Sequence, residues 1–429
     1  LVAGVAVAVL LAWLPGLPVN PGPQGVASAA SKATQGRWRK RVQRGLVVGQ
    51  LALSFTLLAG AGLLVRSLLN LNAVDPGFET ENVLTLQAPG GNFASQQDDE
   101  ELFRELIHEL QAFPGVRAAA VSTWAPLTGQ NPVAFNVRVE GGDDTGDRSH
   151  LTALNSVTPG YLDALGLHLE EGRFIGHEDM AGSDSVIVVN RSMADAYFGS
   201  ESPVGRRMGF SFGGQSWTWM RVVGVVGDSR EYGMSRTGIH TVYRPAAQSF
   251  WGPTVVVSTR GEPEALARHV KEVVHGLDPS RPVDQVQTLA DLKAQDVAPS
   301  RLNATLFGAF ASLALLIAAV GVLGVLAFSV SQRVREFGVR MALGADPRSV
   351  LRSVLVEGGL LVVGALVLGA GGAVLLGRFL SGFLFGVEPV DPTSLGAAAS
   401  VLGAVALAAA FVPALRATRV HPADALRAE

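Results

Sequence analysis

Apolar and polar positions divide the chain into long apolar runs and one long polar stretch. The run at 1–14 is too short for a membrane span of about 20 residues, unless it is the tail of one. Longer runs without charged residues lie at 46–65, 304–330, 358–377 and 394–412. The pattern therefore predicts four membrane spans, preceded by the end of an upstream one.

The polar stretch at 66–303 has the patterns of a mixed α and β domain. Helices are predicted at 98–113, where apolar residues recur on one face, and at 263–276, with Pro263 at its start and Gly276 as its stop. Segments rich in Val, Leu and Thr predict strands at 82–88, 133–140, 151–157, 184–190, 220–227 and 254–259. The interleaving predicts split βαβ subdomains. The predicted fold is thus an α-helical transmembrane bundle with a large α+β domain.

Arginine and lysine near the span ends predict the orientation. Basic clusters lie at 37–44, between 331 and 353, and after the last span, whereas the loop at 378–393 carries one arginine and two acids. Four crossings place all basic clusters on one side, which is then cytoplasmic, with 66–303 outside it. A signal peptide cleaved near "ASAASKA" (27–33) is the alternative for the N-terminal part, but it would leave the cluster at 37–44 outside. We expect instead a flexible cytoplasmic linker after 1–14.

Composition supports a mixed membrane and aqueous protein, with 48% hydrophobic residues, 17% charged residues and a mean hydropathy of +0.31. A net charge of −3 gives no basic field for nucleic acid, and the absence of cysteine excludes disulfides and thiolate sites.

Motifs for catalysis, cofactors and metals are missing. The sequence has no G-x-x-x-x-G-K-[ST] and no H-E-x-x-H. Acidic runs at 98–101 and 143–147 are compatible with paired carboxylates, but a helix start and a Gly-rich turn explain them better. We therefore predict no catalytic, cofactor or metal site, and a chain that is not an enzyme.

One charged segment between two spans has its own pattern, "SQRVREFGVRMALGADPRSVLR" at 331–352. A helix is predicted over about 332–343, and Gly344 is placed to stop it. Asp346 then reads as the N-cap, and Pro347 as the first residue, of a second helix. A loop that only sets topology needs the arginines but neither the apolar stripe nor this corner. The alternative is a docking element for a cytoplasmic partner. The stripe consists of Val334, Phe337, Met341 and Leu343.

These residues resemble a known family. "REFGVRMALGADPRSVL" is similar to the cytoplasmic loop of MacB/FtsX-type ABC transporter permeases, and "FVPALRATRVHPADALRAE" (411–429) to their closing motif. "NSVTPGYLDALGLHLEEGRFIGHED", "VVNRSMADAYFGSESPVGRRM" and "VVGVVGDSREYGM" resemble their periplasmic core domain. The "DPTSL" that follows the penultimate span also resembles the same family. The resemblance covers about 40–429. It is nearest to tandem, duplicated acidobacterial permeases, of which this chain looks like the C-terminal unit.

The resemblance implies the domain order and the partners. The family has four spans and a periplasmic MacB-like core domain with stalk helices, here expected at 66–74 and 288–303. It works with an ABC ATPase subunit or domain that binds the ATP, and with a second permease unit, in tandem or as a dimer. A periplasmic adaptor and an outer-membrane channel are further partners. The expected location is the inner membrane, which the protein would cross several times.

The expected segments are 1–14 (end of an upstream span), 15–45 (cytoplasmic basic linker), 46–65 (span), 66–303 (periplasmic core domain), 304–330 (span), 331–353 (coupling loop), 354–377 (span), 378–393 (short periplasmic loop), 394–412 (span) and 413–429 (cytoplasmic tail).

Function follows from the same resemblance. The expected role is coupling of ATP hydrolysis to movement of the periplasmic domain, for efflux or for lipoprotein or peptide export. The alternative is a non-transporting mechanotransmission protein that regulates a periplasmic cell-wall hydrolase. In the coupling loop, Phe337 and Met341 would insert into a groove of the ATPase, and Arg335 and Arg340 would pair with its acidic rim. The residues expected to couple are Arg335, Glu336, Phe337, Gly338, Arg340, Met341, Leu343, Gly344 and Ala345.

Overall fold

The computed structural model divides the chain into two compact units. We call them the helical unit (Leu1–Ala59, Phe310–Leu376 and Leu395–Glu429) and the mixed unit (Gly60–Ala309 and Gly377–Ser394). The residues that the structure describes are 28–89, 96–129, 133–141, 149–179, 182–211, 216–248, 254–343 and 346–418.

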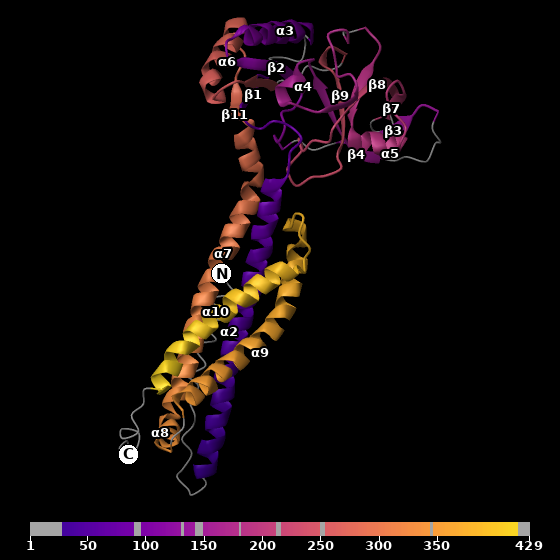
Figure 1. Ribbon diagram of the computed structural model, residues 1–429. Helices are drawn as coiled ribbons and strands as arrows, with labels where there is room; N and C mark the ends of the chain where they lie inside the picture. The colour runs from indigo at the N-terminus through magenta and orange to yellow at the C-terminus, as the bar shows by residue number, and fades with distance from the viewer. Residues whose placement is uncertain are drawn as a thin grey trace. The chain divides into compact units, whose positions relative to one another are not determined.

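Four long helices dominate the helical unit and run side by side within it (Figure 1). They are α2 (Ser28–Ala73), α7 (Leu289–Ser331), α9 (Pro347–Leu380) and α10 (Pro392–Thr418), with the short α8 (Val334–Ala342) between α7 and α9. In the described part of the chain, these four helices are long and apolar enough to cross a membrane. The four predicted spans are thereby found, and α2 and α7 extend through the expected stalk segments.

Small residues bring α9 against α2. A Cβ atom on Gly369 would lie 2.8 Å from the Ala52 carbonyl oxygen, and one on Gly372 would lie 2.5 Å from Thr56 Oγ1. The Thr56 hydroxyl donates to the Gly369 carbonyl at 3.2 Å. Close backbone approach at small residues is how helices pack in lipid, and the "GAGG" stretch at 369–372 has this role.

The flexible linker expected at 15–36 is helical from Ser28 onward. Helix α2 already begins at Ser28 and continues without a break into the first apolar run. The residues from 28 to 45 are mostly Ala, Lys, Arg and Gln, which favour helix, and they directly precede a helix that packing stabilises. The segment at 1–14 lies outside the described residues.

The mixed unit contains a four-stranded piece with two helices on one face. Its strands lie in the order β11 (Asp284–Thr288), β1 (Val83–Gln87), β10 (Thr254–Thr259) and β2 (Val116–Ser122), each antiparallel to its neighbour. Helices α3 (Gln96–Ala112) and α6 (Pro263–Leu277) cover it (Figure 1). Phe103 and Leu106 of α3 and Val270 of α6 pack on Leu84 and Val257 of the strands. This β-α-β, β-α-β order confirms the predicted split βαβ arrangement.

The second piece is inserted between β2 and β10, and its strand pairings close on themselves. The circuit runs from β4 (Ser149–Val157) through β3 (Val133–Val139), β7 (Arg207–Ser211), β8 (Thr218–Val226), β6 (Val186–Asn190) and β9 (His240–Pro245) back to β4. The buried side chains of Ile187, Met208 and Val222 belong to its core. Strand β5 (Leu169–Gly172) pairs with β8, while α4 (Tyr161–Leu165) and α5 (Arg191–Phe198) lie between strands in the chain.

The predicted helices and strands of the polar stretch are all present within a few residues. The stop at Gly276 is one residue early, because α6 includes Gly276 and ends at Leu277. Strands β2, β5, β7, β9 and β11 were not predicted.

Candidate functional site

The coupling loop forms a short helix, as expected. Two of the nine residues, Gly344 and Ala345, lie outside the described residues, and Leu343 directly follows the helix. Six of them lie on α8: Arg335, Glu336, Phe337, Gly338, Arg340 and Met341.

Phe337 faces the protein's own bundle. Its side chain is 2% exposed, and it packs with Val330, Val350, Val354 and Ala414. The ring is therefore not exposed for insertion into a partner's groove in this structure, because three other segments of the same chain already bury it. Phe337 instead holds α8 on the helical unit.

Other residues of the loop face outward. Leu343 is 83% exposed and Val339 is 41% exposed. Glu336 accepts a hydrogen bond from Arg340 at 2.5 Å, one helical turn away. A short helix held by one aromatic residue thus presents apolar and charged side chains to its surroundings.

The predicted corner before α9 is confirmed at Asp346 and Pro347. The Asp346 carboxylate accepts a hydrogen bond from the Arg348 N–H at 2.8 Å, and its carbonyl accepts one from the Ser349 N–H at 2.8 Å. Pro347 is the first residue of α9. The cap at Asp346 and the proline at 347 therefore fix the direction in which α9 leaves the coupling loop and enters the third span.

Sequence reasoning missed an ionic cluster beside this loop. Glu357 of α9 pairs with Arg44 of α2 and lies 3.5 Å from Arg333, and it accepts hydrogen bonds from the Ser329 hydroxyl at 3.2 and 3.3 Å. Its side chain is only 17% exposed. Glu357 immediately precedes the uncharged run at 358–377, which is the signal that could have identified it. The cluster joins α2, α7 and α9.

Replacing Glu357 with alanine is expected to lower the stability of the helical unit. The change leaves Arg44 and Arg333 without their shared carboxylate, at a cost of about 1–2 kcal/mol because both arginines can still reach solvent. Thermal unfolding in detergent measures the effect. Arg44→Ala should show part of it, whereas Arg352→Ala, which removes an exposed arginine of α9, should leave the melting temperature unchanged. Equal melting of Glu357→Ala and the wild type would contradict a structural role for the cluster.

A cleft of about 640 Å³ lies in the mixed unit, between α3 and the segments around α4 and 175–179. Its walls include the apolar Ile107, Ile175 and Ala246. Its polar side chains include His108, Asp163 and His177. The volume and mixed lining are typical of a ligand site between subdomains.

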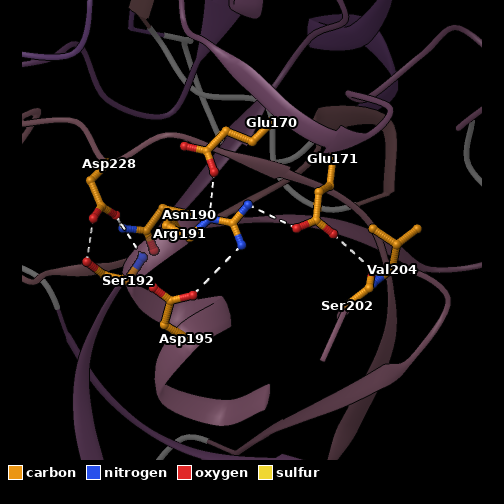
Figure 2. Close-up of polar contacts among 9 residues, drawn as sticks. All are labelled: Glu170, Glu171, Asn190, Arg191, Ser192, Asp195, Ser202, Val204 and Asp228. Carbon is orange, nitrogen blue, oxygen red and sulfur yellow. Dashed lines mark hydrogen bonds and ion pairs between the residues drawn. The ribbon is translucent and has the colours of Figure 1, made fainter. Parts of the chain in front are cut away.

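The motif "NRS" at 190–192 meets two distant segments (Figure 2). Arg191 donates to Glu170 at 2.5 Å and to Glu171 at 3.0 Å. The hydrogen bonds that Glu171 accepts from Arg191 and from Ser202 lower the pKa of Glu171. Arg191 also lies 3.8 Å from Asp195.

Asp228 completes this cluster and caps α5 from a distance. It accepts from the Ser192 N–H at 2.9 Å, from the Ser192 hydroxyl at 2.5 Å and from the Asn190 amide at 2.5 Å (Figure 2). The shared polar groups satisfy one another, which indicates that these motif residues stabilise the fold of the inserted piece.

A buried carboxyl lies where α4 and β9 meet. Glu231 is 5% exposed and accepts hydrogen bonds from the hydroxyls of Tyr161 at 3.1 Å, Ser229 at 3.1 Å and Tyr243. Burial raises the pKa of Glu231, although the hydroxyl donors act in the opposite direction. Burial and the nearby Glu231 raise the pKa of both tyrosines. The donors and burial make this a structural network in the core.

Metal ligation has no support in the described residues, where no group of three His, Asp or Glu side chains could hold an ion.

Comparison with known proteins matches two successive regions of the chain to protein families. Residues 45–289 match the MacB-like periplasmic core domain, and residues 308–422 match the FtsX-like permease C-terminal region. The macrolide export ATP-binding/permease protein MacB of Neisseria gonorrhoeae is 28% identical over 309 residues, which are 67% of this chain and 45% of that protein. The uncharacterised ABC transporter permease YknZ of Bacillus subtilis is 25% identical over 293 residues, which are 64% of this chain and 70% of that protein. The chain thus spans about half the length of the MacB protein.

A solved structure is also similar. The crystal structure of the periplasmic region of MacB from Actinobacillus actinomycetemcomitans covers 53% of this chain and 97% of its own, at 18% identity and a TM-score of 0.34. The family assignment rests on the two sequence matches at 45–289 and 308–422.

Proposed function

The chain belongs to the family of MacB/FtsX-type permeases, which are membrane proteins with a periplasmic core domain, and we propose that it couples ATP hydrolysis by a partner ATPase to movement of that domain. The proposed work is efflux, or export of a lipoprotein or peptide, across or from the inner membrane. The ATPase subunit or domain would bind the ATP, and a second permease unit would complete the transporter.

The observation that carries this proposal is the orientation of α8. Phe337 holds the helix on the bundle, so Val339 and Leu343 remain exposed beside the Glu336–Arg340 pair. An exposed apolar patch rimmed by charge is typical of a protein interface. We therefore propose the coupling loop as the ATPase contact, with the exposed Leu343 in place of the buried Phe337 as its apolar anchor.

The cleft in the mixed unit supports handling of cargo in the periplasm. It has the size and mixed lining of a ligand site, and two imidazoles and the Asp163 carboxylate lie among its lining residues.

Purification of the full-length protein from its own membranes in detergent tests the proposal. We expect an ABC ATPase to co-purify, and the double change Val339→Ala and Leu343→Ala to reduce its recovery about tenfold, as the loss of an interface anchor does. Leu360→Ala removes a leucine of α9 whose 68% exposure lies between those of Val339 and Leu343, and should leave the recovery unchanged. Absence of any ATPase from the wild-type preparation would count against the coupling function, and co-purification of a cell-wall hydrolase would favour the signalling role.

A further inference from the structure

The connection between α9 and α10 is bound to α2 within the mixed unit. The connection includes the short helix η3 (Ser381–Phe383) and residues 384–391. The Asn70 amide donates to the Gly386 carbonyl at 2.9 Å, and the Phe385 N–H donates to the Ser67 hydroxyl at 2.8 Å. Arg66 donates to Asp391, and to the Thr393 hydroxyl at 2.6 Å. One helical turn of α2 therefore contacts the connection at 385–386 and again at 391.

Asp391 serves two helices at once. Its side chain is 10% exposed, and besides Arg66 it accepts from the Ser394 N–H at 2.8 Å and the Ser394 hydroxyl at 2.6 Å. It is thus the N-cap of α10 as well as the ionic partner of α2. Burial alone would raise the pKa of Asp391, but its hydrogen bonds from Ser394, Arg66 and Thr393 outweigh burial and hold its pKa well below the ordinary value. The carboxylate remains charged throughout the physiological range.

The same connection reaches the core of the mixed unit. Phe385 packs against the buried cluster that includes Leu71, Leu289 and Met234, and the Arg230 guanidinium lies 5.5 Å from the centre of its ring. Residues of α2, α7 and the 230–234 segment therefore share contacts with one loop.

We propose that Arg66 and Asp391 are positioning residues of the coupling pathway, which make the α9–α10 connection move together with α2. Displacement of α9, which begins directly after the coupling loop, would then reach the base of the periplasmic domain through this connection, in addition to the helices α2 and α7. We call the contact, made by Arg66, Ser67, Asn70, Phe385, Gly386 and Asp391, the stalk clasp. The role rests on the proposed function.

Hydrogen exchange of the full-length protein in detergent tests the clasp itself. Arg66→Ala should accelerate exchange of peptides covering 384–391 about tenfold, since a hydrogen bond to a charged group is lost. Asp391→Asn keeps an oxygen acceptor for the Ser394 N–H and should give the same change without loss of α10. Arg378→Ala removes an exposed arginine just before the connection and should leave exchange unchanged. Unaltered exchange in both clasp variants would overturn the clasp.

Exchange in the complex with the co-purified ATPase tests the coupling role. With ATP and vanadate, the wild type should show a nucleotide-dependent change in peptides covering 230–234, and Arg66→Ala should lose it while it retains ATP hydrolysis and ATPase recovery. A purely structural clasp would leave the nucleotide-dependent change intact, and that result would overturn the coupling role alone. No ATPase on the wild type would overturn the proposed function, and with it this role, whereas the exchange of 384–391 would still decide whether the clasp exists.

Discussion

Phe337→Ala is expected to release α8 from the bundle and to abolish recovery of the ATPase, while the four long helices remain folded. Truncation of a buried phenylalanine costs about 3–5 kcal/mol, and Phe337 packs in the cluster with Val330, Val350, Val354 and Ala414. A nine-residue helix cannot sustain itself without packing. Hydrogen exchange over 334–342 and co-purification measure the two consequences.

Two variants separate anchoring from contact. Phe337→Leu keeps an apolar side chain in the pocket and should retain most of the protection of α8. Leu343→Ala should weaken ATPase recovery without faster exchange in α8, because Leu343 is exposed. Unchanged exchange over 334–342 in Phe337→Ala would show that the ring does not hold the helix.

Local sequence patterns were sufficient to predict those helices and strands whose burial is visible in the order of their apolar and polar residues. The four apolar runs, the one-sided helix α3 and the Val-rich strand β10 were predictable because periodicity and length reflect burial directly. The start of α9 was predictable from Asp346 and Pro347 because a cap depends only on neighbouring residues.

The missed strands depend on their neighbours. Strand β2, "VRAAAVS", has an alanine run that favours helix, and it becomes a strand because it pairs with β10. Strand β11, "DQVQT", is polar and lies at the edge, where it pairs only with β1 among the described strands. Pairing between segments over a hundred residues apart leaves no local signal.

The candidate site was predictable in its position but not in its orientation. The stripe through Phe337 fits either a partner or the protein's own bundle, and the choice depends on Val350, Val354 and Ala414 in other helices. The stalk clasp and the Glu357 cluster likewise join residues more than 300 positions apart, Arg66 with Asp391 and Arg44 with Glu357. A single sequence contains the charges but not their pairing.

Glu231→Ala is expected to destabilise the periplasmic domain by about 3 kcal/mol or more, because the hydroxyls of two fully buried tyrosines, Tyr161 and Tyr243, lose their acceptor and a cavity remains. Thermal unfolding of the full chain in detergent, followed by tryptophan fluorescence, measures the change, since Trp124, Trp217 and Trp219 lie in the mixed unit.

The pH dependence gives this prediction its signature. The folded state holds the Glu231 proton more tightly than the unfolded state, since burial raises the pKa of Glu231 above its ordinary value. The free energy of unfolding therefore falls as pH rises from the unfolded pKa through the folded one, by at most about 1.4 kcal/mol per pH unit, and is level above it. Glu231→Ala and Glu231→Gln lack this slope, so the stability gap between each variant and the wild type should be largest below the unfolded pKa of a glutamate and should narrow as pH rises.

Tyr232→Phe is the matched control for the network. Its hydroxyl is buried one residue from Glu231 and has no hydrogen-bond partner among the described residues, so its loss should be neutral or stabilising at every pH. Tyr243→Phe removes a donor to the carboxylate instead, and its cost should grow as pH rises, because a charged acceptor loses more than a protonated one. If the two tyrosine variants melted alike across this range, the Glu231 hydrogen bonds would not be what stabilises the junction of α4 and β9.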